Sequence, residues 1–326
     1  MNTNVLAGQL ADVLHPVLGA VSVENLRALT GGASRITWAF TATTGGESRP
    51  LILRTGSPDE VHAGMELEAR AQRIAGAAGA PVPQILVASD SPVALGNPYL
   101  ICNEIAGETI VRKIQRSLDD AGRAALLQQC ADALVAIHRA DPAEAALEPG
   151  DQLSLWRAHL DEIGDTTATF EWAFRWLETN PPAASTPTLV HGDFRMGNLI
   201  IDLDKPVPHL AAVLDWELVH SGDACEDLAW FSIRAWRFGA PKERSAGGLG
   251  SIEDLLSAYE QAGGAHVDRA QFRWWLVQAT LRWGVICRYQ AHRHLSGETP
   301  SVELATIGRR VCETEWDLLN LLQDAS

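Results

Sequence analysis

The sequence predicts an α+β protein of two lobes, in which a small antiparallel sheet comes first and a mostly helical part follows. Short β-branched and aromatic runs separated by glycine pairs occupy the first hundred residues, whereas long stretches with helical periodicity dominate the rest. Runs of strands followed by runs of helices favour this class over a parallel doubly wound sheet, in which the two element types alternate. We expect an N-lobe of residues 1–105 and a C-lobe of residues 106–326.

Within the N-lobe, glycine pairs separate runs of strand-forming residues, which is typical of strands joined by tight turns. The expected strands span residues 23–29, 35–43, 51–54, 85–88 and 98–105. An amphipathic helix precedes them at residues 4–18, and helical spacing predicts a second helix over 59–78, which stops at Gly79 ahead of Pro81. The N-lobe should therefore be a five-stranded sheet with one long helix against it.

The C-lobe is expected to contain long helices around a few short strands. Helical periodicity marks residues 119–140, 153–163 and 169–179, and further helices run to the end of the chain. Three short apolar runs follow a proline-rich connector and lie at residues 189–190, 199–201 and 210–214.

The net charge is −15, from 26 basic and 41 acidic residues. A protein that binds duplex nucleic acid needs a basic face, and electrostatic attachment to a membrane needs basic clusters, so neither partner is expected. Five scattered cysteines without a C-x-x-C pair predict neither a disulfide framework nor a zinc site. The N-terminal residues carry no basic segment ahead of an apolar run, so we expect no signal peptide and a cytoplasmic location.

The strongest functional signal is a pair of polar clusters, each beside an apolar strand-like run. The first is His191–Asn198 (HGDFRMGN) and the second is Asp215–Glu217 (DWE). Phosphoryl transfer needs a carboxylate that orients the attacking hydroxyl, here Asp193, and oxygen ligands for magnesium ions that bridge the phosphates, here Asn198 and Asp215. Capped hairpin turns use the same residue types, but both clusters in this order favour the catalytic interpretation.

These clusters resemble those of the aminoglycoside phosphotransferase and choline-kinase-like family, small-molecule relatives of the protein kinases. Gly192 stands where protein kinases carry arginine. The resemblance implies a protein-kinase-like fold that uses ATP and Mg²⁺. It implies that Asp193 is the catalytic base, that Asn198 and Asp215 are metal ligands, and that His191 supports the catalytic loop.

A third segment extends the resemblance. Gly222–Trp230 (GDACEDLAW) is similar to the family's G-D-P-x-x-D-L-A segment, in which the second aspartate, here Asp227, braces the catalytic loop. Either Asp223 or Asp227 can also cap the helix that follows, and a capping carboxylate can still accept a bond from a neighbouring loop.

The resemblance also places nucleotide-binding residues in the N-lobe. Leu29–Arg35 (LTGGASR) occupies the position of the loop that covers the nucleotide, so the backbone N–H groups of Gly32, Ala33 and Ser34 are expected near the phosphates, although G-x-G-x-x-G is absent. Arg54 replaces the phosphate-binding lysine of the wider family. A guanidinium can still form an ion pair and grip phosphate.

The expected ion-pair partner of Arg54 is Glu68, and Glu66 on the same predicted helix is the competing candidate. The last strand of the N-lobe resembles the strand that leads into the hinge of the family. Backbone groups of Asn103 and Ile105 would then hold the adenine edge.

A late aromatic and arginine-rich helix gives the candidate acceptor site, at Arg273, Trp275, Arg282 and Arg288. Arginines there would receive an anionic substrate, and an amphipathic helix with an aromatic core stripe explains the same residues equally well. Residues 293–297 (RHLSG) and 307–313 (IGRRVCE) are similar to phosphotransferase domains attached to acyl-CoA dehydrogenases.

The sequence therefore predicts an ATP-dependent phosphotransferase that moves the γ-phosphate to a hydroxyl of a small molecule. The similarity to dehydrogenase-linked domains favours a hydroxyacid or a hydroxyacyl-CoA as the acceptor. The alternatives are an aminoglycoside or choline-like amino-alcohol kinase and, in view of Arg54, a non-catalytic nucleotide-binding pseudokinase. Protein-kinase activity is not expected, because Asp215 and Asp223 lie too close together for a long activation loop.

Overall fold

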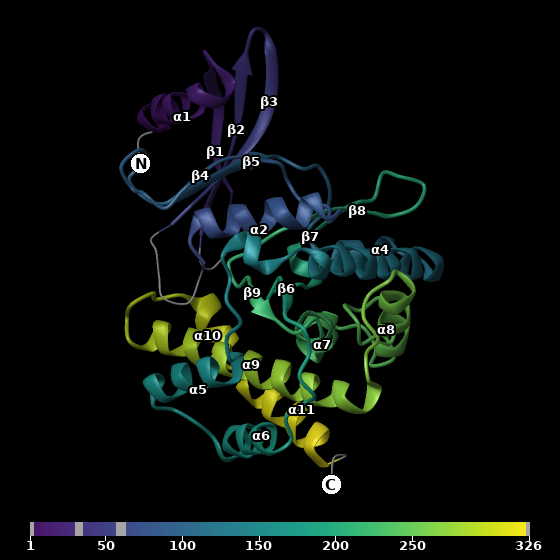
Figure 1. The fold of residues 1–326 in the computed structure, drawn as a ribbon. Helices are drawn as coiled ribbons and strands as arrows, with labels where there is room; N and C mark the ends of the chain where they lie inside the picture. Colours follow the sequence, from purple (N-terminus) through teal and green to yellow (C-terminus); the bar gives the residue numbers. More distant parts are fainter. Residues whose placement is uncertain (1–2, 30–34, 57–62, 324–326) are drawn as a thin grey trace.

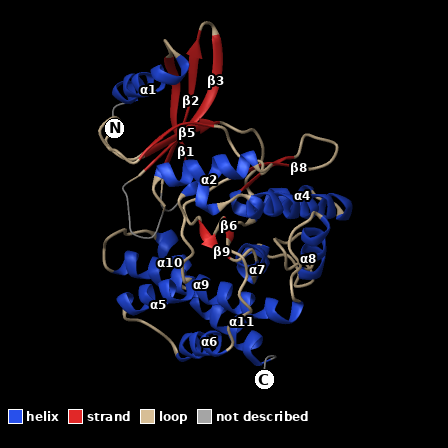
Figure 2. Ribbon diagram, viewed as in Figure 1, coloured by secondary structure: helices blue, strands red, loops and turns tan. Residues whose placement is uncertain are grey.

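The computed structural model describes residues 3–29, 35–56 and 63–323. The first part of the chain forms one antiparallel sheet with the strand order β1-β2-β3-β5-β4 (Figure 1, Figure 2). In that order the strands span Ser22–Leu29, Ile36–Thr44, Glu47–Thr55, Tyr99–Asn103 and Ile85–Ser89. The five predicted strands are present, and β3 begins four residues earlier than its apolar run.

A two-residue turn joins β2 to β3. Thr44 pairs with Glu47 across the hairpin, and Gly45 and Gly46 between them have φ angles of 58° and 90°. Positive φ at both central positions matches the twist of antiparallel strands and favours glycine, which has no Cβ to clash. The glycine pair is therefore a structural requirement of this hairpin.

One face of the sheet is covered by α1 (Thr3–Leu18). Leu51 and Leu53 of β3 lie in the same buried apolar cluster as the leucines of this helix. Successive side chains of a strand point to opposite faces, so Ile52 between them points away from α1. The alternation assigns each β3 residue to a face, and it places Arg54 on the face opposite α1.

The opposite face is covered by α2 (Met65–Ala77). Its Met65 and Ala69 form a buried cluster with Leu100 and Cys102 of β5. The described helix begins at Met65, so the earlier start predicted at residue 59 is not observed, and residues 57–62 lie outside the described ranges.

The second part of the chain is mostly helical. Its helices are Val111–Ser117 (α3), Asp120–Arg139 (α4), Gln152–Ile163 (α5), Ala168–Thr179 (α6), Cys225–Ser232 (α7), Ile252–Gln261 (α8), Arg269–Leu295 (α9), Val302–Gly308 (α10) and Val311–Gln323 (α11). The long helix α9 packs against α5, α6, α7, α10 and α11 and is the central support of this part (Figure 1).

Two short antiparallel ladders complete the second part. They pair β6 (Thr188–Val190) with β9 (His220–Gly222), and β7 (Leu199–Asp202) with β8 (His209–Val213). The predicted α+β class is confirmed, and the predicted lobe boundary falls in the segment between β5 and α3. Within the described ranges, none of the helices combines the length and the apolar character needed to cross a membrane.

Candidate active site

The predicted catalytic loop starts where β6 ends. Gly192 has a φ of 82°, and a Cβ atom built on it would lie 2.2 Å from the carbonyl oxygen of Leu218. A side chain at this position would meet rigid backbone and would also strain the left-handed conformation. Packing against the segment before β9 therefore explains why glycine stands at this position of the motif.

Asp193 lies in a shell of hydrogen-bond donors. Its Oδ1 accepts a bond from Trp230 Nε1 at 2.8 Å, and its Oδ2 accepts one from Asn198 Nδ2 at 2.7 Å. Arg195 Nε lies 3.1 Å from both carboxylate oxygens. The donors hold the carboxylate in one orientation near the surface, since 13% of its side chain remains exposed.

Asp227 supports the start of the catalytic loop through hydrogen bonds to its backbone. Its two carboxylate oxygens accept the backbone N–H groups of His191 at 2.8 Å and Gly192 at 2.9 Å, and His138 Nε2 lies 3.2 Å from Oδ2. Burial alone would raise the pKa of Asp227, but the bond with His138 and the bond from the His191 backbone lower it below its ordinary value. Asp227 is fully buried, so its negative charge is stabilised by the same donors of the loop and of His138 that it holds in place.

His191 connects the two polar clusters. Its Nδ1 accepts the backbone N–H of Asp193 at 3.1 Å, which leaves Nε2–H to donate to the carbonyl oxygen of Leu214 at 3.0 Å. Burial lowers the pKa of His191, so the neutral ring is favoured. The backbone of Leu214 also donates to Asn198 O at 2.8 Å. These bonds fix Asp215, the next residue, relative to the catalytic loop.

Arg54 joins the sheet to the second cluster. Its guanidinium donates to Glu68 Oε2 at 2.8 Å and to Asp215 Oδ1 at 2.6 Å. The competing candidate Glu66 is exposed and instead exchanges bonds with Asp90. Glu68 and not Glu66 therefore pairs with Arg54.

The pKa of Asp215 favours its charged form, as a cation-binding carboxylate requires. Burial would raise its pKa, but the positive charges of Arg54 and Arg195 outweigh this effect and lower the pKa below its ordinary value. Its backbone φ of 68° is unusual for a residue other than glycine. Strained backbone of this kind persists where the surroundings over-determine it, which is common at functional sites.

Sequence reasoning missed Arg35. Its buried guanidinium lies 3.5 Å from Glu68 and 3.7 Å from Glu217, and it donates to Ala63 O at 2.9 Å. Together with Arg54, it makes a network of two arginines and three carboxylates between the sheet and the loop that carries Asp215. The Arg that ends the predicted nucleotide loop, Leu29–Arg35, was the available signal.

The predicted metal ligands fit Mg²⁺ in their chemistry. The amide nitrogen of Asn198 donates to Asp193, so its amide oxygen is left for a cation, and Asp215 has a second carboxylate oxygen besides the one that Arg54 contacts. The described residues contain no cluster of three or more His, Cys, Asp or Glu able to hold a metal. Such a sparse set suits Mg²⁺, which is commonly held by one or two protein groups plus substrate phosphates.

The predicted nucleotide contacts are only partly described. Gly32, Ala33 and Ser34 lie outside the described residues. The backbone N–H of Asn103 donates to Gln84 O at 3.0 Å, so this group is not available to an adenine edge as expected. Ile105 follows β5 by two residues and keeps its place as the hinge candidate.

The expected convergence of late arginines on an acceptor is wrong. Arg273 and Arg282 are nine residues apart on α9, which puts them on opposite faces of the helix. Arg282 is buried, donates to the carbonyl oxygen of Gly192 at 2.8 Å and stacks on Trp230. Arg288 forms an ion pair with Asp165. Arg282 therefore supports the catalytic loop and is not placed to receive a substrate anion.

Trp275 also lies elsewhere. It lines a separate cavity with Trp274, Gln278 and residues before α5 and around β9. The tryptophan that contacts Asp193 is Trp230, and Trp236 packs against Trp230. Arg195 stacks over the Trp236 ring with 4.8 Å between its Cζ and the ring centre. Arg195 lies inside the HGDFRMGN motif, so its position next to Asp193 was a signal that the sequence contained.

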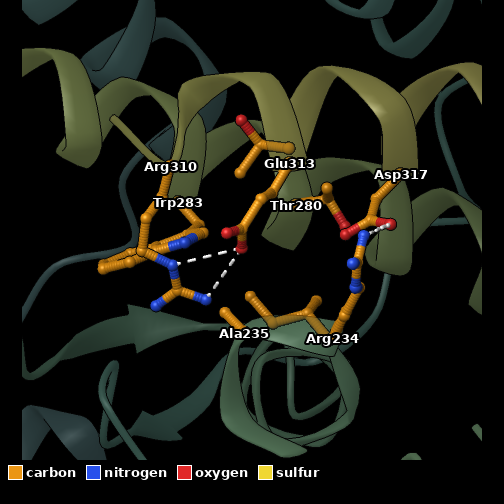
Figure 3. A pocket seen from close by; sticks show the side chains of 9 residues that line it. Arg234, Ala235, Thr280, Trp283, Arg310, Glu313 and Asp317 are labelled. Atoms are coloured by element: carbon orange, nitrogen blue, oxygen red, sulfur yellow. Dashed lines mark hydrogen bonds and ion pairs between the residues drawn. The ribbon is translucent and has the colours of Figure 1, made fainter. Parts of the chain in front are cut away.

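A small cavity borders this aromatic group on the side of α11. Figure 3 shows that two ion pairs occupy its walls, Arg310 with Glu313 and Arg234 with Asp317, with Trp283 beneath Arg310. Its volume is about 10 Å³, which is room for about one water molecule. This cavity is therefore too small for an acceptor substrate.

The sequence and the fold of the chain both have matches among known proteins. Residues 25–275 match the sequence profile of the phosphotransferase enzyme family, which is more than half of the chain. The chain belongs to this phosphotransferase family. The family predicted from the sequence is thereby confirmed.

Curated relatives share the similarity at low identity. The chain is 25% identical over 275 residues to acyl-CoA dehydrogenase family member 10 of Mus musculus, which covers 78% of the chain and 25% of that protein. It is 26% identical over 276 residues to acyl-CoA dehydrogenase family member 11 of Homo sapiens, which covers 77% of the chain and 34% of that protein. The chain thus spans about a quarter to a third of these relatives.

Solved structures confirm the protein-kinase-like fold. A protein from Ralstonia eutropha described as an aminoglycoside phosphotransferase superposes with a TM-score of 0.74 at 21% identity, over 95% of this chain and 97% of that one. A spectinomycin phosphotransferase in complex with ADP and spectinomycin gives a TM-score of 0.65 at 12% identity, over 96% and 98%. At these identities the likeness establishes the fold alone.

Proposed function

We propose that the protein is an ATP- and Mg²⁺-dependent phosphotransferase that transfers the γ-phosphate of ATP to a hydroxyl group of a small molecule. The observation that carries the proposal is the arrangement of Asp193 between Asn198, Arg195 and Trp230, with Asp215 fixed to the same loop through His191. Membership of a phosphotransferase family and ADP complexes of structural neighbours support the use of a nucleotide.

In this proposal Asp193 orients the acceptor. Its Oδ1 accepts from Trp230, its Oδ2 accepts from Asn198, and Arg195 Nε is shared between the two oxygens. A carboxylate has about four acceptor sites, so one is left to accept the O–H of the substrate. The hydroxyl oxygen attacks the γ-phosphorus while the bond to the ADP oxygen breaks, and the hydroxyl proton passes to Asp193. Transfer of this kind depends mainly on positioning and electrostatic stabilisation, which the fixed carboxylate supplies.

The cations are assigned from the same geometry. Asn198 and Asp215 would hold Mg²⁺, which bridges and neutralises phosphate oxygens when bound. Arg54 would contact phosphate in place of the usual lysine, after exchanging its bond to Asp215 for one to the nucleotide. Glu68 keeps the Arg54 guanidinium at the site during this exchange, because its carboxylate accepts a 2.8 Å bond from the nitrogen that does not contact Asp215.

For the acceptor we propose a hydroxyacid or a hydroxyacyl-CoA thioester. Arg195 supports an anionic acceptor, because its guanidinium lies beside Asp193 and its side chain is 25% exposed. The acyl-CoA dehydrogenase relatives support an acyl thioester. An aminoglycoside or amino alcohol is the competing class, supported by the spectinomycin complex of a neighbour.

The test is a screen for acceptor-dependent ADP release with hydroxyacids, hydroxyacyl-CoA thioesters, amino alcohols and aminoglycosides, each with Mg²⁺. Phosphorylated product is then identified by mass spectrometry. Asp193→Asn serves as the inactive control. We expect turnover with the anionic panel. Arg195→Gln should lower kcat for every acceptor, because Arg195 helps to orient Asp193, and it should raise the KM of the anionic acceptors alone. Turnover only with the amino alcohols and aminoglycosides would contradict the proposed acceptor class but would support the proposed phosphotransferase activity.

One observation favours a second candidate, a nucleotide-binding protein without turnover. The 2.6 Å bond between Arg54 and Asp215 occupies an oxygen of the proposed metal ligand. If this pair stays closed, nucleotide binds without Mg²⁺ and no acceptor is phosphorylated. Titration with a fluorescent ATP analogue in EDTA and in Mg²⁺, run beside the acceptor screen, separates the two: equal affinity in both buffers and no turnover would establish the second candidate.

A further inference from the structure

We propose that the cavity lined by Trp274, Trp275 and Gln278 is a second ligand site, distinct from the phosphotransfer site, that binds a small organic cation. The inference is independent of the proposed function. The cavity has a volume of about 230 Å³, which admits a small amine or quaternary ammonium compound. Its other polar walls come from the start of α5, from the connector before β6 and from the β9–α7 junction, namely Asp151, Ser185, Ser221, Asp223 and Glu226.

One buried polar side chain of this cavity has no partner within the described part of the protein. Ser221 is 1% exposed, and its Oγ makes no hydrogen bond to a described residue. Gln278, which is 4% exposed, lines the same cavity and adds a carboxamide to it. Buried polar groups are almost always satisfied, and each exception needs an explanation. A ligand that accepts from Ser221 and exchanges a bond with Gln278 supplies one.

The charge of the lining selects the chemistry of the ligand. Asp151, Asp223 and Glu226 line the cavity, and none of its described lining residues is a lysine or an arginine. Both oxygens of each carboxylate already take part in a bond. Asp151 accepts from Leu153 N and from Ser154, Asp223 accepts from Cys225 N and Ser185 Oγ, and Glu226 bonds with Asp223 N and His220. A carboxylate oxygen can accept a second donor. The balance of charge on the walls is negative, which favours a cation over an anion or a neutral polyol.

The aromatic walls favour the same ligand. Trp274 and Trp275 pack edge to face, with 4.6 Å between ring centres and 80° between ring planes. Tryptophan faces attract ammonium groups, and the attraction grows when the cation is desolvated. A choline-sized cation with one hydroxyl would fit this lining. Its charge would lie against the indoles and carboxylates, and its hydroxyl would bond to Ser221 and Gln278.

The cavity is separate from the phosphotransfer site. Glu226 precedes Trp230 by one turn of α7, and Gln278 precedes Arg282 by one turn of α9, so each lies about 6 Å along its helix from a residue that contacts the catalytic loop. Arg282 contacts Trp156, Trp230 and the catalytic loop at Gly192 O, and it is not among the residues that line the cavity.

The experiment is equilibrium binding of choline to the full chain by calorimetry, compared with its neutral isostere 3,3-dimethylbutan-1-ol. We expect saturable choline binding at least about tenfold tighter than binding of the isostere. Trp275→Leu and Gln278→Met should each weaken choline binding by about tenfold or more. Asp151→Asn keeps the helix cap, since asparagine also caps, and should weaken it through loss of charge alone. Trp316→Leu, at an exposed tryptophan of α11, is the matched control and should bind choline like the wild type.

Three results would overturn the inference. Equal affinity for choline and the isostere would show that the cavity does not select a positive charge. Absence of binding at millimolar choline would show that it does not take this class of ligand. Loss of binding in Trp236→Leu with retention in Trp275→Leu would place choline beside Asp193 instead. Because the readout is binding without ATP, failure of this inference is distinguishable from failure of the phosphotransferase proposal, which the acceptor screen tests.

Discussion

The indole of Trp230 donates a hydrogen bond of 2.8 Å to Oδ1 of Asp193. The two residues are 37 positions apart, and the bond joins α7 to the catalytic loop. It fixes one carboxylate oxygen while Asn198 fixes the other. The orientation of the proposed base is thus set by a helix that is itself held by Asp227 and Arg282.

Replacing Trp230 by phenylalanine tests this bond. Phenylalanine keeps an aromatic ring that can stack on Arg282, and it lacks the N–H donor and part of the indole volume. A hydrogen bond to a charged group contributes about 1.5–3 kcal/mol, so we expect kcat to fall by about tenfold or more with little change in the KM for ATP. Steady-state kinetics measures it. An unchanged kcat would mean that Asn198 and Arg195 suffice to orient Asp193.

Asp193→Ala tests the base itself. Loss of general-base and positioning effects should lower turnover by about 10²–10⁴-fold, while nucleotide binding is retained, because the proposed phosphate contacts belong to Arg54. Nucleotide affinity from a fluorescence titration is the control for folding. Turnover within tenfold of wild type would show that another group accepts the proton.

Arg54→Met should destabilise the fold. It leaves the fully buried Glu68 without its 2.8 Å partner. Breaking a buried pair commonly costs about 3–5 kcal/mol, and we expect about 2–3 kcal/mol in the free energy of unfolding because Arg35 still lies 3.5 Å from Glu68. Urea denaturation measures the change.

Two variants control the Arg54 experiment. Arg27→Met removes an ion pair with Glu104 in which the two side chains are 60% and 34% exposed, and it should cost less than about 1 kcal/mol. Arg54→Met combined with Glu68→Gln should be more stable than Arg54→Met alone. If the double variant were no more stable, the stability attributed to the pair would lie elsewhere.

Gly192→Ala should strongly destabilise the catalytic loop. The new Cβ would meet Leu218 O at 2.2 Å, in addition to the strain of a φ of 82°. Gly19→Ala is the matched control, because Gly19 has a φ of 75° but open space around its Cβ, and strain alone costs about 1–2 kcal/mol. A greater loss of thermal stability in Gly192→Ala than in Gly19→Ala is expected. Equal losses would show that the loop can shift.

The neutral His191 ring predicts a pH dependence of stability. Burial lowers the pKa of His191 below its ordinary 6.5, so the unfolded chain binds the proton more readily than the folded one. Its contribution is fully present above pH 6.5 and is lost as the pH falls below that value toward the folded pKa. Urea midpoints measured between pH 8 and pH 5 should therefore fall more steeply in the wild type than in His191→Gln. Equal slopes would contradict a buried neutral ring.

The sequence by itself determined the fold class, the five-stranded sheet and the catalytic loop. These features depend on patterns close together in the chain. Glycine pairs enforce turns, helical periodicity repeats every few residues, and Asp193 and Asn198 lie within one short loop. Physical constraints between near neighbours leave a direct record in the order of the residues.

Only the tertiary structure decided which distant side chains meet. The orientation of α2 made Glu68 rather than Glu66 the partner of Arg54, and α7 brought Trp230 to Asp193. The geometry of α9 turned Arg282 toward the catalytic loop and Trp275 toward a separate cavity. An arginine on a helix carries the same letter whether it receives a substrate or supports a loop. Its role is set by the face on which it lies and by the packing around that face.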